Sequence, residues 1–268
     1  MGDNRFAVDC SHVAELLTGI EDHIAGATAI GKDRVGIFNH RGAVLPVFDF
    51  RRALGHHTFA ERFKEMTDFI RAREQDHISW LKDLKHSAET RARFTKATDP
   101  TLCDFGKWYE SVKKDPGEMQ KLTMGSVAIC YLFEAFDQPH RRIHGIAERV
   151  LELASSDRLT EASDLIQQTW DNELATMKEL FKTFLEQYRR ALRSTGMVLH
   201  LGNRSATLLV DSIHCVRNCS EDNFESLPTM GADAASGFAD AGVDVDGVLC
   251  MRLDAEAIFD LCGLQEAA

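Results

Sequence analysis

The chain has 268 residues, of which 44% are hydrophobic and 27% are charged, and its formal net charge is −11. This composition is typical of an ordinary globular protein, and the length favours two domains. The negative charge argues against non-specific binding to nucleic acid or to an anionic membrane. The longest apolar run, residues 127–133, is far shorter than the ~20 residues of a membrane span, so we expect no membrane insertion.

The N-terminus and the cysteines indicate where the protein works. The first ten residues, MGDNRFAVDC, contain neither a basic segment nor an apolar one, so we expect no secretory signal. The seven cysteines are an odd number and are scattered along the chain. These features predict reduced thiols in a cytoplasmic protein and argue against a disulfide framework.

The first predicted element is a short β-strand over residues 44–50, which follows the turn signal His40-Arg-Gly42. Residues 56–190 then predict helices, because apolar residues recur there at steps of three and four. Three long stripes and one short segment show this spacing: Phe59 to Leu84, residues 105–112, Leu132 to Leu151, and Leu165 to Tyr188. Four helices with one apolar stripe each predict a four-helix bundle.

The last part of the chain returns to β-rich segments. Strands are predicted over residues 196–201, 206–211 and 247–253, and the Gly/Ala/Asp-rich stretch 231–246 is interpreted as a loop. Two β-rich flanks around a helical middle predict an α+β fold. We expect a split β domain, built as a small β-barrel or sandwich, with a helical domain inserted. The boundaries expected are 1–55 and 191–268 for the β domain, and 56–190 for the insertion.

The helical segment holds residues suited to metal binding. His140 and His144 are four residues apart, so both imidazoles leave one helix face. His77 lies on the first apolar stripe and Cys103 precedes the short segment, so all four side chains are expected to face the bundle interior. Three imidazoles and a thiolate are a tetrahedral set that suits a closed Zn²⁺ site. Spacing alone leaves the alternative of hydrogen-bonded core histidines open.

Enzymatic readings fit less well. His140-Arg-Arg-Ile-His144 has Arg141 where an HExxH metalloprotease needs its glutamate. Glu74-Gln-Asp-His77 is one Glu-x-x-His motif of a di-iron bundle, but the second would be Asp137-Gln-Pro-His140. A hemerythrin-like iron or oxygen-binding bundle would need further ligands. No catalytic residues are therefore assigned, and we expect the protein not to be an enzyme.

Three motifs occur in order along the helical segment: His77-Ile-Ser-Trp80, Cys103-Asp-Phe-Gly-Lys-Trp-Tyr109 and His140-x-x-x-His144. Together they resemble the chemoreceptor zinc-binding (CZB) domain, and the resemblance covers about residues 56–190. It implies a four-helix bundle that holds Zn²⁺ through three histidines and one cysteine, here His77, Cys103, His140 and His144. Pro139 departs from the pattern, and we expect it to kink the long helix or to start a new one.

The flanks resemble the CheW-like adaptor domain of bacterial chemotaxis. Residues 38–55 contain Asn39-His-Arg-Gly42 followed by a proline and an aspartate, which is similar to that family's Asn-x-Arg-Gly-x-x-x-Pro-x-x-Asp motif. Leu208-Leu-Val-Asp-Ser-Ile213 is similar to its Val-Asp-Ser-Val segment. The resemblance implies partner-binding residues in the first motif, here Asn39, Arg41 and Gly42. For Arg41, a local salt bridge to Asp49 or another carboxylate remains the alternative.

Together the two resemblances imply a cytoplasmic zinc-binding signalling adaptor of a bacterial chemotaxis-type pathway. Its CheW-like part would contact a CheA-type histidine kinase or a chemoreceptor, and the zinc or redox state of the bundle would be coupled to those contacts. A homodimer is a further expectation from the resemblance to the CZB domain. Two alternatives stay open: a zinc-stabilised scaffold without a sensing role, and a hemerythrin-like iron or oxygen-binding bundle.

Overall fold

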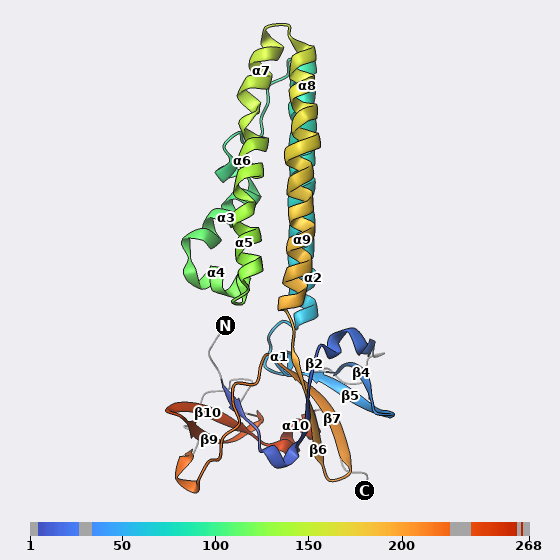
Figure 1. Cartoon of the computed structure of the whole chain (residues 1–268), viewed down its shortest axis with the longest axis vertical. Helices are drawn as coiled ribbons and strands as arrows, with labels where there is room; N and C mark the ends of the chain where they lie inside the picture. Colours follow the sequence, from blue (N-terminus) through green and yellow to red (C-terminus); the bar gives the residue numbers. More distant parts are fainter. Residues whose placement is uncertain (1–4, 27–33, 226–236, 262–263, 265–268) are drawn as a thin grey trace. The chain divides into compact units, whose positions relative to one another are not determined.

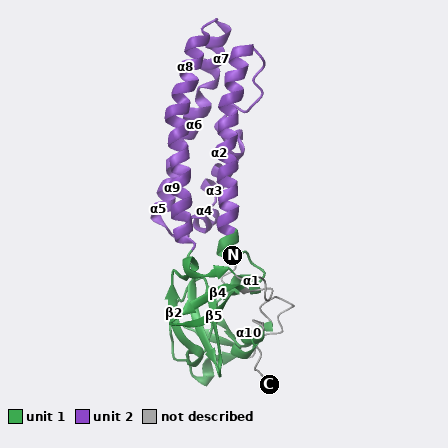
Figure 2. Cartoon of the chain, turned by 90° about the vertical axis from the view of Figure 1, so that its right-hand side faces the viewer, with its two compact units in different colours: residues 1–61, 193–268 green, residues 62–192 purple. Residues whose placement is uncertain are grey.

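The structure, a computed structural model, describes residues 5–26, 34–225, 237–261 and 264. It divides the chain into two compact units, which Figure 2 shows in different colours. One unit contains residues 1–61 and 193–268, and the other contains residues 62–192. The first unit, called the β unit below, is therefore made from both ends of the chain. The second is called the helical unit.

The strands of the β unit form two sheets in the described part of the chain. The four-stranded sheet has the order β1 (Phe6–Ala7), β10 (Val248–Leu253), β9 (Ala239–Val245) and β8 (Phe224–Glu225). The six-stranded sheet has the order β2 (Val13–Thr18), β6 (Thr195–Leu201), β7 (Arg204–Val210), β5 (Ala43–Asp49), β4 (Arg34–His40) and β3 (Ala25–Gly26). Two short helices accompany them, α1 (Phe50–Ala53) and α10 (Ala255–Leu261).

Main-chain pairing joins the two flanks of the insertion. Strand β2 pairs antiparallel with β6, with Val13 opposite Leu199, and β5 pairs parallel with β7, with Val47 opposite Thr207. The core of the β unit is also shared. Phe48 and Phe50 from the first flank are buried with residues from the second, such as Phe259. The β unit therefore needs both flanks to fold.

The helical unit begins with one long helix, α2 (Phe59–Thr90). Thr58 and Glu61 form a capping box at its start, because each side chain accepts a hydrogen bond from the other residue's main-chain N–H. The remaining helices are α3 (Asp104–Lys114), α4 (Pro116–Thr123), α5 (Val127–Ala135), α6 (Asp137–Gly145), α7 (Ala147–Ser155), α8 (Leu159–Thr169) and α9 (Ala175–Ala191). Figure 1 shows α5, α6 and α7 following one another along the unit.

The helix around Pro139 is interrupted, although its course continues. Helix α5 ends at Ala135 and α6 starts at Asp137, with Phe136 between them in a right-handed helical conformation (φ −65°, ψ −29°). Pro139 is buried in the first turn of α6, where its missing N–H removes one bond to the preceding turn. The break thus falls three residues before the proline, and His140 and His144 share the single helix α6.

The structure confirms an α+β fold with a helical bundle between two β-rich flanks. The structure differs from the expected β-barrel, because the described strands form two sheets and neither closes on itself. The prediction of a loop at 231–246 is wrong for Ala239–Val245, because these residues form β9. Residues 231–236 of that stretch lie outside the described residues. Within the described chain, no helix combines the length and apolarity needed to cross a membrane.

Candidate metal centre

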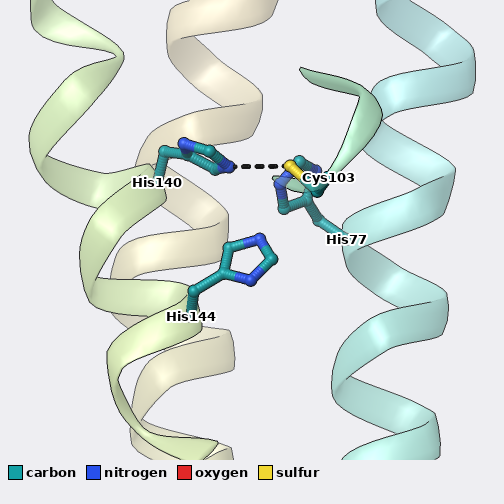
Figure 3. A group of neighbouring side chains, drawn as sticks. All are labelled: His77, Cys103, His140 and His144. Carbon is teal, nitrogen blue, oxygen red and sulfur yellow. Dashed lines mark hydrogen bonds between the residues drawn. The ribbon is translucent and has the colours of Figure 1, made fainter. Parts of the chain in front are cut away.

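Four side chains meet inside the helical unit. His77 comes from α2, Cys103 precedes α3, and His140 and His144 lie on α6 (Figure 3). Each residue offers one ligand atom, and these four atoms all lie within 4.8 Å of one another. The three histidines are buried and Cys103 is partly buried. The structure therefore brings together all four residues that the sequence proposed as metal ligands, in a cluster able to hold a metal ion.

Main-chain carbonyls fix how two of the imidazoles point. His77 Nδ1 lies 2.6 Å from the carbonyl oxygen of Arg73, and His144 Nδ1 lies 3.2 Å from that of Ala97. A carbonyl only accepts, so each Nδ1 carries the proton and donates it, which leaves each Nε2 with a free lone pair. Both Nε2 atoms are buried without a hydrogen-bond partner among the described residues.

The orphaned nitrogens test whether a metal fits. A buried polar atom without a partner is costly, and two such atoms facing one point are unusual in a stable core. A metal ion would take up both lone pairs. The two unpartnered nitrogens therefore fit a set of metal ligands better than a group of hydrogen-bonded core histidines.

Cys103 is the N-cap of α3. Its sulfur accepts a hydrogen bond from the N–H of Gly106 at 3.2 Å and lies 3.2 Å from His140 Nε2. Gly106 is required for this packing, because a Cβ at that position would collide with the carbonyl oxygen of Pro100. The glycine of the Cys-x-Phe-Gly motif therefore lets the start of α3 pack against the preceding turn, Pro100–Leu102.

Burial governs the titration of the cluster. It lowers the pKa of all three histidines below the ordinary 6.5, to about 4 for His144 and to about 2 for His140. The neighbouring His77 also lowers the pKa of both of these. Burial raises the pKa of the Cys103 thiol, while the N–H groups of Gly106 and Phe105 oppose that effect. The imidazoles are therefore neutral at pH 7, which is the form that binds metals.

Aromatic side chains enclose the cluster. The Phe105 ring meets the His140 ring edge-on, with 4.8 Å between the ring centroids. The centroids of the Trp80 and His144 rings are also 4.8 Å apart. Trp80 also donates from Nε1 to the carbonyl oxygen of Ala97 at 2.8 Å, the same oxygen that accepts from His144. These contacts explain why the motifs contain aromatic residues beside the histidines and the cysteine.

The donor set indicates which metals suit the cluster. Among the described residues it consists of three imidazoles and one thiol, with no carboxylate in the group. Carboxylates are typical ligands of di-iron bundles, whereas nitrogen and sulfur ligands in a closed set of four are typical of structural Zn²⁺.

Comparison with known families agrees with this chemistry. Residues 77–151 match the chemoreceptor zinc-binding domain. The matched range contains all four cluster residues, from His77 at its start to His144 near its end. The match confirms the resemblance that the three sequence motifs indicated for this part of the chain.

One solved structure aligns with the whole chain, at low sequence identity. It is the scaffolding protein TtCheW from Thermoanaerobacter tengcongensis, with 11% sequence identity and a TM-score of 0.42. The alignment covers 100% of this chain and 92% of that one. No curated protein sequence matches this chain. An adaptor role of the flanks therefore stays a prediction from their sequence motifs.

The residues proposed for partner binding lie in the β unit, at the turn between β4 and β5. Arg41 and Gly42 both have positive φ values, 51° and 88°, and the Gly42 N–H donates to Asn39 Oδ1 at 3.1 Å. Arg41 is exposed and forms an ion pair with Glu15 at 3.0 Å. The local salt bridge thus exists with Glu15, and Asp49 instead caps α1.

Two carbonyl groups that contact the cluster were not predicted from the sequence. The Arg73 carbonyl could have been found, because it lies one helical turn before His77 and accepts from its Nδ1. The Ala97 carbonyl could not, since it belongs to an irregular segment between α2 and α3. Nothing in the identity of an alanine indicates that its main chain orients a histidine.

Proposed function

We propose that this protein is a zinc-responsive signalling adaptor of a bacterial chemotaxis-type pathway, working in the cytoplasm and without catalytic activity. In this proposal the helical unit holds Zn²⁺ through His77, Cys103, His140 and His144. The β unit acts as a CheW-like adaptor that contacts a CheA-type histidine kinase or a chemoreceptor. The observation that carries the proposal is the buried His/Cys cluster, with two unpartnered Nε2 atoms, inside the region that matches a zinc-binding domain.

Zinc would supply a cross-link between helices. The proposed ligands belong to α2, the start of α3, and α6, so bound zinc would hold three segments together. The neutral imidazoles need to lose no proton, whereas Cys103 would bind as a thiolate after its proton leaves. The N–H of Gly106 donates to this sulfur and would help to stabilise the thiolate.

The proposed signal is loss of the zinc ion or of one of its ligands. Removal of zinc, or oxidation of Cys103, would leave buried ligand atoms without a partner and loosen the packing of α3 against α2 and α6. Both ends of the helical unit continue into the β unit, at residues 61–62 and 192–193. A change in the bundle would therefore bias the conformation of the adaptor at both crossings, as a shift between two populations.

The metal part of the proposal is tested by zinc content. We expect purified wild-type protein to contain one zinc per chain and Cys103→Ala to retain much less, because a buried imidazole set without its thiolate binds zinc more weakly. Cys130→Ala is the matched control, since Cys130 is also a partly buried cysteine of the helical unit and is absent from the cluster. Equal zinc content in wild type and Cys103→Ala would rule out the four-ligand site.

The adaptor part is tested by partner capture. The full chain would be used to pull down kinase and receptor signalling domains, with and without a zinc chelator. We expect binding that changes on chelation and that Arg41→Ala weakens. Arg52→Ala is the control because Arg52 is another exposed arginine of the β unit, outside the β4–β5 turn. Binding that ignores Arg41→Ala would contradict the partner-binding role.

The same experiment separates the two alternatives. A protein that stays folded after chelation and binds its partners unchanged would be a zinc-stabilised scaffold without a sensing role. Iron in place of zinc, with a visible charge-transfer band, would identify an iron-binding bundle. The carboxylate-free donor set of the cluster argues against that second alternative.

A further inference from the structure

A second group of cysteines lies in the β unit, remote in sequence from the metal cluster. Cys215 and Cys219 are exposed, and Cys250 is buried on β10. Burial raises the pKa of Cys250, and the nearby Cys215 and Cys219 contribute to the same shift. Cys250 is distant from the other two in sequence, and its strand follows the β9–β10 turn, whose Asp246 pairs with Arg217.

Two contacts hold the segment that carries the exposed pair. Arg217, midway between the two cysteines, forms an ion pair with Asp246 at 3.0 Å, and Asp246 lies in the turn between β9 and β10. Directly after Cys219 in the chain, Ser220 and Asn223 form a capping box, in which the Ser220 main-chain nitrogen lies 2.9 Å from Asn223 Oδ1. Cys215 and Cys219 thus stay on either side of a tethered residue.

No helix or strand fixes the main chain around the two cysteines. Residues 212–220 form neither helix nor strand, and all of their side chains are exposed. A disulfide needs two Cα atoms within about 4.4–6.8 Å, a separation that a single turn brings about for residues four apart. No ladder of main-chain hydrogen bonds has to break for this turn to form.

A preformed metal cage fits this group less well. Within the described residues, the His77 cluster is the one group of three or more histidine, cysteine or acidic side chains whose ligand atoms converge tightly. Cys215, Cys219 and Cys250 are all described and do not meet that condition. A disulfide needs two sulfurs only, and two exposed thiols on one segment without secondary structure provide them.

We propose that Cys215 and Cys219 are a redox-sensitive dithiol, which hydrogen peroxide converts into an intramolecular disulfide. The thiolate sulfur of one cysteine attacks the peroxide, the O–O bond breaks, and a sulfenic acid and a hydroxide form. The thiolate of the other cysteine then attacks the sulfenic sulfur and expels a second hydroxide, and the two hydroxides take up the two thiol protons as water. Two thiols and one peroxide thus give one disulfide and two waters.

Cys250 serves as the internal contrast. It is buried, its pKa is raised chiefly by burial, and its sulfur lies 3.6 Å from the carbonyl oxygen of Val248. A thiol that stays protonated and covered reacts slowly with peroxide. The disulfide would close a ring that contains Val216, Arg217 and Asn218, and it would act on the β9–β10 turn through the Arg217–Asp246 pair.

Peptide mapping tests the proposal on the full, zinc-loaded chain. Reduced protein is treated with hydrogen peroxide, its remaining thiols are alkylated, and it is digested with trypsin without reduction. Cleavage after Arg204, Arg217 and Arg252 places Cys215 in peptide 205–217, and places Cys219 with Cys250 in peptide 218–252. We expect these two peptides to be joined, two hydrogens lighter than their sum, and to separate on reduction.

Four variants decide which cysteines are joined. Cys215→Ser and Cys219→Ser should each abolish the linked peptide, whereas Cys250→Ser and Cys10→Ser should leave it unchanged. Cys10 is the matched control because it is another exposed cysteine of the β unit. A link that survives in Cys219→Ser but disappears in Cys250→Ser would overturn the proposed pair. Oxidation of Cys215 and Cys219 to sulfinic acids with no linked peptide would overturn the dithiol itself.

Discussion

Asp49 shows how one side chain can make the stability of the β unit depend on pH. It is buried at the N-terminus of α1, and its Oδ1 accepts from the Arg51 N–H at 2.9 Å. Burial raises the pKa of Asp49 from 3.8 to about 6, although the N–H groups of Arg51 and Arg52 act in the opposite direction. The folded protein therefore holds this proton more tightly than the unfolded chain does.

The sign of the resulting pH dependence follows from this shift. The contribution of Asp49 to stability is complete below pH 3.8 and is lost as the pH rises through about 6. Asp49→Asn keeps an oxygen for the cap and cannot ionise. We expect the unfolding free energy of the variant, relative to wild type, to rise by up to about 3 kcal/mol between pH 4 and pH 7. Urea unfolding at several pH values measures this difference, and a constant difference would contradict the prediction.

At the scale of elements, the start of α3 determines where Cys103 lies. Gly106 packs directly against the main chain of Pro100, so the turn Pro100–Leu102 and the first turn of α3 fit together only without a side chain at that position. The Cys103 sulfur caps this same helix. The position of one proposed ligand thus depends on a glycine contact.

Gly106→Ala should therefore weaken metal binding without removing a ligand. The added Cβ forces the start of α3 to move, at a cost of about 1–3 kcal/mol, and Cys103 moves with it. We expect zinc affinity to fall roughly 10-fold or more, measured by competition with a chelator of known affinity. Gly145→Ala is the control: it adjoins His144, and a Cβ there meets nothing within 4 Å. An equal loss of affinity in both variants would show that helix packing at Pro100 is irrelevant.

The elements also show which parts of the fold were predictable. The helices of the bundle follow from apolar stripes with a helical period, and α2, α6 and α9 overlap the stripes that predict them. The sequence does not predict strands β2 and β4. It predicts a loop where β9 lies, because Ala239–Val245 contains two aspartates, two alanines and a glycine. Its strand conformation depends on pairing with β10 on one side and β8 on the other. Tertiary pairing of this kind leaves little trace in local sequence.

The cluster was more predictable than the sheets. His140 and His144 lie on one helix, so their spacing alone places both rings on one face. The sequence could not indicate which ring nitrogens face the centre, because that depends on the carbonyl groups of Arg73 and Ala97. The partner of Arg41 was equally hidden, since Glu15 lies on another strand.

For the whole molecule, the two crossings between the units are tied down within the β unit. Arg51 is buried, and its guanidinium donates to the carbonyl of His57 and to Asp211, which follows β7. The Ser194 hydroxyl, where the chain returns, donates to Glu21 at 2.6 Å. Each crossing is therefore anchored to a residue of the opposite flank, so a strained crossing would act on the β unit.

Zinc should then be visible in the thermal unfolding of the whole chain. At a free zinc concentration 100 times the dissociation constant, binding to the folded state adds about 2.7 kcal/mol, which for a unit of this size is on the order of 10 °C in Tm. We expect calorimetry to show this rise for wild type in zinc relative to chelator, and none for Cys103→Ala. If the crossings couple the units, part of the shift will also appear in the unfolding of the β unit, followed by hydrogen exchange of β5 and β7. A rise of the same size in Cys103→Ala would place the zinc effect outside the cluster. A shift confined to the helical unit would show that the two units respond independently.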